Sequence, residues 1–126
     1  MTIPGINLYS AAVIISEIDD ISRFKSKEKL ASYSGLVPRQ DQSGSRDIRG
    51  HISKRGDHML RTAIYQSTLV ATKHNPVISQ YYNRLAERGM PRKKALVAAS
   101  RKMCHIIWSV WHNNKPFEVP DRLNTQ

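Results

Sequence analysis

The sequence predicts a mainly α-helical single domain, and three observations support this fold class. Apolar residues recur at spacings of three and four along most of the chain, as on one face of a helix. Residues that start and stop helices flank these periodic segments. The length of 126 residues, 40% of them apolar, suits one modest core and not two. We therefore expect about five helices.

Two helices are predicted in the N-terminal part of the chain. The first covers residues 8–18, with Asn7 as its N-cap and Asp19-Asp20 at its end. A short second helix starts after Ser26 and ends at Gly35. The predicted inner face of the first helix consists of Leu8, Ala11, Ala12, Ile15 and Ile18, with Ile14 beside them.

The composition of residues 36–56 predicts that they form one long, basic, irregular loop. The segment contains Pro38, Gly44, Gly50 and Gly56, and its apolar residues follow neither helical nor strand spacing. Long irregular segments in small domains are usually either functional or disordered.

Three further helices are predicted after this loop. The first begins at Asp57 and runs to about His74; the second is opened by Asn75-Pro76 and ended by Gly89. The third starts at Pro91 and closes at Asn113-Asn114. We expect the folded domain to span residues 3–114 and residues 115–126 to form a flexible tail.

The charge balance points to a polyanionic partner. Twenty Lys and Arg against ten Asp and Glu give a net charge of +10. Nucleic acid is the first candidate partner and an acidic membrane surface the second.

No stretch approaches the roughly 20 apolar residues of a spanning helix, and the N-terminus lacks the features of a signal peptide. Cys104 is the single cysteine, and we expect its side chain to be a small buried apolar group. These features suit a cytoplasmic protein without a membrane partner.

The N-terminal residues Ile3-Pro4-Gly5-Ile6-Asn7 are similar to the hairpin of a helix-hairpin-helix motif. Such a hairpin exposes backbone N–H groups that bind a DNA phosphate without reading sequence. Gly5 and Asn7 are the candidate residues, with Asn7 where the motif usually has a second glycine. An ordinary turn leading into a helix explains the same residues equally well.

Two further segments could contact phosphates. Within the predicted loop, Ser43 and Ser45 flank Gly44 among several arginines, which suits a phosphodiester site, although a solvated basic loop explains the residues alone. Over residues 84–102, seven Lys and Arg face one acid, Glu87. The candidate nucleic-acid-binding residues are Arg39, Arg46, Arg49, Lys54, Arg55, Arg61, Arg92, Lys93, Lys94, Arg101 and Lys102. No His/Cys cluster or set of carboxylates predicts a metal site in this domain, so we expect no cofactor here.

Several segments in series resemble one family, the C-terminal transposase domain of the insertion sequence 110/116/902 family. The resemblance covers roughly residues 3–112. The matching segments are Ile3-Pro4-Gly5-Ile6, Leu30 to Pro38, Gln42-Ser43-Gly44, Ile52 to Gly56 with Leu60-Arg61, His74-Asn75-Pro76, Arg88-Gly89, Lys94 to Ala98, and Arg101-Lys102.

This resemblance implies a DNA-cleaving and DNA-joining enzyme. It implies that Ser43 is the nucleophile that attacks the scissile phosphate, with Ser45 as the alternative. It also implies an N-terminal RuvC-like domain that holds Mg²⁺ outside this sequence, DNA as substrate, a structured guide RNA as a further partner, and a homo-oligomeric full-length protein. The isolated domain is then expected to be inactive.

Two other functions are compatible with the residues. The first is a non-catalytic helix-hairpin-helix module that only binds nucleic acid. The second is an assembly domain, whose association would be insensitive to salt, whereas phosphate contacts weaken steeply with salt.

Overall fold

The computed structural model describes residues 3–36 and 46–120, and for residues 46–57 it describes the backbone alone. Within these ranges the chain forms five α-helices and one 3-10 helix, with no strand. They are α1 (Leu8–Ile18), η1 (Ile21–Arg23), α2 (Lys27–Tyr33), α3 (Arg46–His74), α4 (Pro76–Glu87) and α5 (Arg92–Asn113). The predicted mainly α fold class is confirmed.

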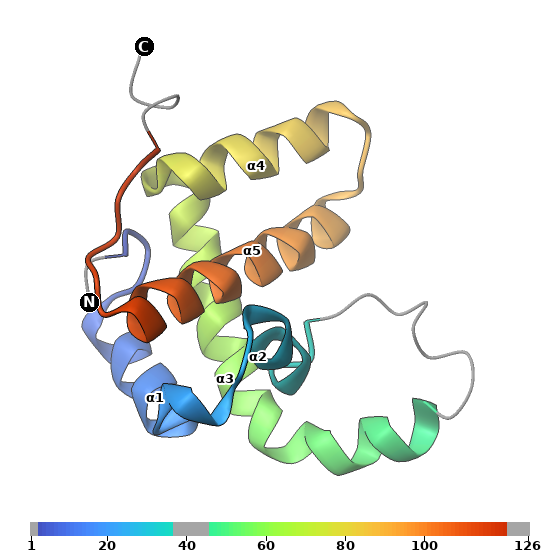
Figure 1. Ribbon diagram of the computed structural model, residues 1–126. Helices are drawn as coiled ribbons and strands as arrows, with labels where there is room; N and C mark the ends of the chain where they lie inside the picture. Colours follow the sequence, from blue (N-terminus) through green and yellow to red (C-terminus); the bar gives the residue numbers. More distant parts are fainter. Residues whose placement is uncertain (1–2, 37–45, 121–126) are drawn as a thin grey trace.

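The long helix α3 is the centre of the arrangement. Helices α1, α4 and α5 each pack against it, and α5 also contacts α2, η1 and α4 (Figure 1). Helices α4 and α5 are joined by a short turn and lie side by side, with their joined end away from α1 (Figure 1). The domain therefore has an N-terminal side built on α1 and a second side built on α2, α4 and α5.

Three helix starts follow directly from capping residues. The Asn7 side chain accepts a hydrogen bond from the Ser10 N–H at 2.8 Å, and Ser26 accepts one from the Lys29 N–H at 3.2 Å. The Asn75 side chain accepts from the second and third residues after it, Val77 and Ile78, at 3.0 and 3.3 Å. These bonds satisfy backbone donors that a helix leaves unpaired, and they fix the boundaries that the sequence predicted.

One predicted boundary is wrong. Helix α3 begins at Arg46 and not at Asp57, so residues 46–56 are helical and the irregular segment 36–56 does not extend that far. Gly50 and Gly56 cost a helix about 1 kcal/mol each relative to alanine, a cost that a long helix packed on its neighbours can absorb. Glycine alone was therefore a poor indicator of a break. Residues 37–45 lie outside the described residues.

The predicted inner face of α1 is also wrong in part. Ala11, Ile14 and Ile18 are buried as the helix packs on α3, whereas Leu8 is 88% exposed and Ile15 is 48% exposed. Ala12 lies on the exposed side with them. Both sets have helical spacing because α1 is apolar on more than one side, so periodicity alone could not choose between them.

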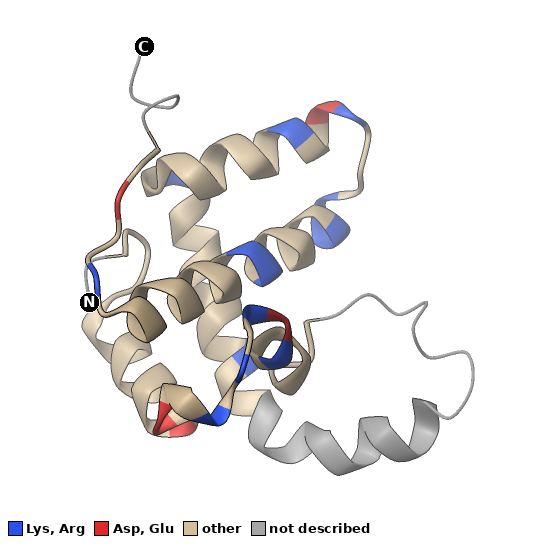
Figure 2. Cartoon of the chain, in the orientation of Figure 1, with Lys and Arg blue, Asp and Glu red and all other residues tan. Residues whose placement is uncertain are grey.

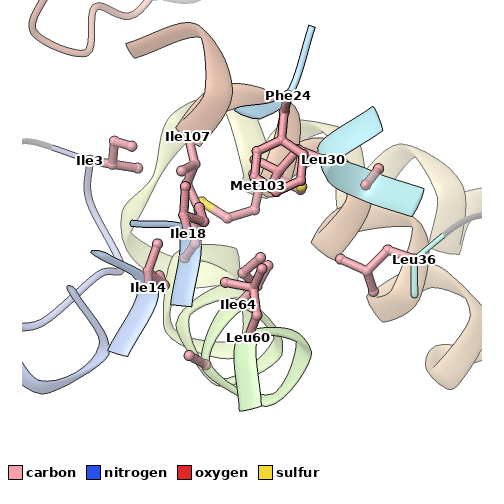
Figure 3. Close-up of a cluster of buried hydrophobic side chains, with 14 of the residues drawn as sticks. Ile3, Ile14, Ile18, Phe24, Leu30, Leu36, Leu60, Ile64, Met103 and Ile107 are labelled. Atoms are coloured by element: carbon pink, nitrogen blue, oxygen red, sulfur yellow. The ribbon is translucent and has the colours of Figure 1, made fainter. Parts of the chain in front are cut away.

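The core lies where α1, α3 and α5 meet. Figure 3 shows Ile14 and Ile18 of α1 facing Ile64 of α3 and Met103 of α5. Cys104 is buried in the same cluster, as the sequence predicted. Four aromatic residues lie partly buried against this core: Tyr81, Tyr82, Trp108 and Trp111. Phe117 does so too, in the otherwise irregular segment 115–120; the predicted flexibility of the tail stays a prediction.

Candidate nucleic-acid interface

The structure covers the predicted site residues unevenly. Ser43, Ser45 and Arg39 lie outside the described residues. The backbone of Arg46, Arg49, Lys54 and Arg55 belongs to the first half of α3, and their side chains are not described. The remaining candidates are described with their side chains: Gly5, Asn7, Arg61, Arg92, Lys93, Lys94, Arg101 and Lys102.

The residues directly before the segment that carries Ser43 are held by hydrogen bonds and packing, and we call them the loop stem (Ser34, Gly35 and Leu36). Helix α2 ends there with two hydrogen bonds, from the Gly35 N–H to the Ser32 carbonyl at 3.0 Å and from the Leu36 N–H to the Ala31 carbonyl at 2.9 Å. Gly35 has φ +73°, the left-handed conformation that this helix ending requires. Leu36 is buried, so the position at which the Ser43 segment begins is fixed by packing.

Two arginines from different helices meet at this loop stem. The Arg101 side chain, from α5, donates a hydrogen bond from Nε to the Leu36 carbonyl at 2.8 Å. The Arg61 side chain, from α3, lies against Gly35: a Cβ at Gly35 would be 2.7 Å from the Arg61 Nη1. Both residues are partly buried. Each was named from the sequence as a phosphate contact, and the fold brings them together although they are 40 positions apart.

A second group of cations occupies the far end of the α4–α5 pair, which we call the basic tip. Its five cations are all exposed, and its single acid is Glu87. Figure 2 shows the charge gathered at the end of α4 and along the first half of α5. Such a surface can contact several phosphates at once. The basic tip comprises Arg84, Arg88, Arg92, Lys93 and Lys94.

The N-terminal turn has a structural role that the sequence did not reveal. Gly5 has φ +107°, and a Cβ there would lie 2.7 Å from the Ala71 Cβ and 2.9 Å from the Ser67 carbonyl oxygen, so the turn packs directly on α3. The Asn75 Nδ2 donates to the Pro4 carbonyl at 3.1 Å. Asn7 is an N-cap in extended conformation at φ −88°, so it does not adopt the left-handed conformation that a glycine would favour at this position. Phosphate binding by this turn stays a prediction.

The sequence did not reveal a further group of charged residues, which surrounds His105 on α5. Lys27 and Glu28 of α2 and Arg101 and Lys102 of α5 all act on this ring electrostatically. Burial, reinforced by Lys27, lowers the pKa of His105 below its ordinary value. Lys27 lies far from Lys102 and His105 in the sequence, so no local motif could have revealed that the three lie together.

Within the described part of the chain, no group of three or more His, Cys, Asp or Glu side chains could hold a metal ion. The described residues also include no helix both long and apolar enough to cross a membrane. The described side chains of the candidate interface, at the loop stem and in the basic tip, thus offer hydrogen-bond donors and positive charges.

Comparison with known proteins shows the family of this chain. The family model described as transposase IS116/IS110/IS902 family matches residues 1–83. The chain belongs to this transposase family. The match includes the loop stem, the whole segment that carries Ser43, and α3 with Arg61.

Individual relatives extend the similarity over α4 and α5. A pilin gene-inverting protein of Moraxella bovis is 34% identical over 119 residues, covering 93% of this chain and 37% of the relative. The transposase for insertion sequence element IS1111A of Coxiella burnetii is 35% identical over 114 residues, covering 86% of this chain and 31% of the relative. An uncharacterized 43.6 kDa protein of insertion element IS110 from Streptomyces coelicolor is 26% identical over 117 residues, covering 93% of this chain and 29% of the relative.

The chain spans about a third of the length of the curated relatives that it matches. No solved structure matches it.

Proposed function

We propose that this chain is the DNA-binding and serine-bearing part of an insertion-sequence transposase that cleaves and rejoins DNA. The observation that carries the proposal is the convergence of Arg61 and Arg101 at the loop stem, one residue before the segment that contains Ser43. Membership of the transposase family supplies the class of reaction.

In the proposed reaction, the Ser43 hydroxyl attacks the phosphorus of the scissile phosphodiester. An Oγ–P bond forms while the bond from phosphorus to one deoxyribose oxygen breaks; the serine proton passes to solvent and the departing oxygen takes up a proton. A hydroxyl of the partner DNA strand reverses these steps during joining. Guanidinium groups beside the phosphate would stabilise the negative charge that grows on its oxygens.

The remaining machinery is proposed to lie outside this chain. The described residues offer no metal site, so Mg²⁺ would be held by another part of the full-length protein, in a RuvC-like domain. A structured guide RNA and further copies of the full-length protein are proposed as partners. The isolated chain is accordingly expected to bind DNA without cutting it.

The test uses the full-length transposase with Mg²⁺, the RNA of its element and end-labelled DNA. Reactions stopped with detergent are examined for protein bound covalently to DNA, with wild type, Ser43→Ala, Ser45→Ala and Lys73→Gln compared. Loss of the adduct with Ser43→Ala alone is the expected result, and Lys73→Gln, an exposed cation in the last turn of α3, is the control. Loss with Ser45→Ala alone would move the nucleophile to Ser45.

A non-catalytic nucleic-acid-binding module is the second candidate function. The exposed basic tip favours it, since phosphate contacts by these five cations need no serine. Under this alternative, cleavage by the full-length protein persists in both serine variants, while the 126-residue chain still binds DNA with strong salt dependence.

A further inference from the structure

A cavity of about 360 Å³ lies along α5, and of the residues that border it only Lys102 was named from the sequence as a nucleic-acid contact. Lys27 at the start of α2 borders it, as do Lys102 and His105 of α5. Lys115 and Glu118, in the irregular segment after α5, border it as well. The volume falls within the range of small-ligand sites and would accommodate a phosphate group with the sugar attached to it.

The charges around this cavity are predominantly positive. Its lining contains three lysines against the single carboxylate of Glu118. Lys102 is also held in place, because its Nζ lies 5.4 Å from the centre of the Tyr81 ring on α4. An anion in this cavity would thus meet ammonium groups from α2 and α5.

The His105 ring adds an unused hydrogen-bonding atom. Its Nε2 is buried and has no hydrogen-bond partner among the residues that the structure describes. Buried polar atoms are almost always paired, and the residue that carries this one borders the cavity, so a small rotation of the ring would offer Nε2 to a partner from outside the chain. Arg101, one turn earlier on α5, donates to the Leu36 carbonyl and so connects this region to the loop stem.

We propose that this cavity binds a phosphate group, with Lys27 and Lys102 balancing its charge and the His105 Nε2–H donating to one of its oxygens. The phosphate is either a phosphodiester of a nucleic-acid strand or a free phosphate, since both offer the same oxygens. The site does not depend on Ser43 or on the basic tip, so it can fail while the proposed function stands.

The test follows the histidine side chains of the 126-residue chain by NMR at constant ionic strength, while inorganic phosphate is added. The His105 signals are expected to shift and its pKa to rise, because bound phosphate offsets Lys27, Arg101 and Lys102 and accepts from Nε2–H. Glu28 already acts in the same direction in the free protein, and Lys115 and Glu118 are the other charged groups that line the cavity. The NMR signals of His74, at the end of α3, should not shift when phosphate is added.

Three variants separate a built site from general charge attraction. Lys102→Gln and Lys27→Gln should each weaken phosphate binding about tenfold, as expected for a lost hydrogen bond to a charged group. His105→Phe keeps the ring and removes the donor, and should weaken binding similarly. Lys73→Gln removes an exposed charge in the last turn of α3 that neither lines the cavity nor belongs to the basic tip, and should have little effect. Equal weakening by Lys73→Gln would overturn the proposal.

A single-stranded oligonucleotide distinguishes the two sources of phosphate. If it moves the His105 signals and displaces inorganic phosphate, the ligand is a nucleic-acid strand. If inorganic phosphate still binds at saturating oligonucleotide, the site takes free phosphate. If the oligonucleotide binds to the chain and neither ligand affects His105, the nucleic-acid interface stands and this proposal falls.

Discussion

The two sides of the domain differ in what their surfaces offer. The first 20 residues contain no Lys or Arg and three acids, Glu17, Asp19 and Asp20, whereas residues 84–102 contain seven cations and one acid. Figure 2 shows the same contrast between α1 and the α4–α5 pair. Both sides pack on the same central helix, so the core does not impose the difference. The α1 side is therefore expected to stabilise the fold, and the α4–α5 side to bind polyanions.

The largest expected effect is on stability, from the buried face of α1. Ile14→Ala should lower the free energy of unfolding by about 2–5 kcal/mol, since Ile14 is fully buried, and its neighbour Ile15, which is 48% exposed, gives the matched control. Ile15→Ala should cost less than about 1 kcal/mol. Urea denaturation followed by circular dichroism measures both. Equal losses would show that the two faces of α1 are wrongly assigned.

The N-terminal turn tests whether the α1 side takes part in binding at all. Gly5→Ala should cost about 2–4 kcal/mol, because an added Cβ meets Ala71 and Ser67 and because φ +107° strains a side chain. Gly89→Ala is the matched control: Gly89 has φ +90° but open space around it, so its variant carries the backbone cost only. DNA affinity of the folded Gly5→Ala variant should be unchanged. A loss of affinity without a loss of stability would instead favour the helix-hairpin-helix interpretation.

On the opposite side, neutralising the basic tip should weaken DNA binding without unfolding the protein. Changing Arg88, Arg92, Lys93 and Lys94 together to Gln should lower the affinity of the 126-residue chain for duplex DNA on the order of 100-fold at moderate salt. The slope of log Kd against log salt should fall by about one for each lost phosphate contact. Fluorescence anisotropy measures both quantities. A thermal unfolding temperature close to that of wild type shows that the effect is on binding, and an unchanged salt slope would remove the basic tip from the interface.

The elements that the sequence predicted well are those whose determinants are local. Asn7, Ser26 and Asn75 each cap a helix within three residues, so their effect is visible in the sequence. The inner face of α1 could not be chosen, since it depends on which side α3 approaches. Likewise, Arg61 and Arg101 could be named as basic residues, but their meeting at Gly35 and Leu36 is a property of the packed helices.

The last expected effect concerns the boundary between the basic surface and the core, both of which α5 supplies. Cys104 lies two positions after Lys102 and three after Arg101, and positive charges near a thiol ordinarily lower its pKa. Burial nevertheless raises the pKa of the Cys104 thiol from 9.0 to about 12, with only partial opposition from its contact with Ser34.

The cationic surface of α5 thus ends short of its buried face, and two consequences can be measured. Cys104 should react with Ellman's reagent at pH 8 only as fast as the chain unfolds. The pKa of Cys104 is higher in the folded than in the unfolded chain. The contribution of the buried neutral thiol to the free energy of unfolding is therefore complete below pH 9.0 and is lost as the pH rises toward 12. Over that interval the free energy of unfolding of wild type should fall more steeply than that of Cys104→Ala, by up to about 1.4 kcal/mol per pH unit. Rapid labelling of the folded protein at pH 8 would mean that the thiol is exposed, and that the positive surface of α5 continues into what is described as its core.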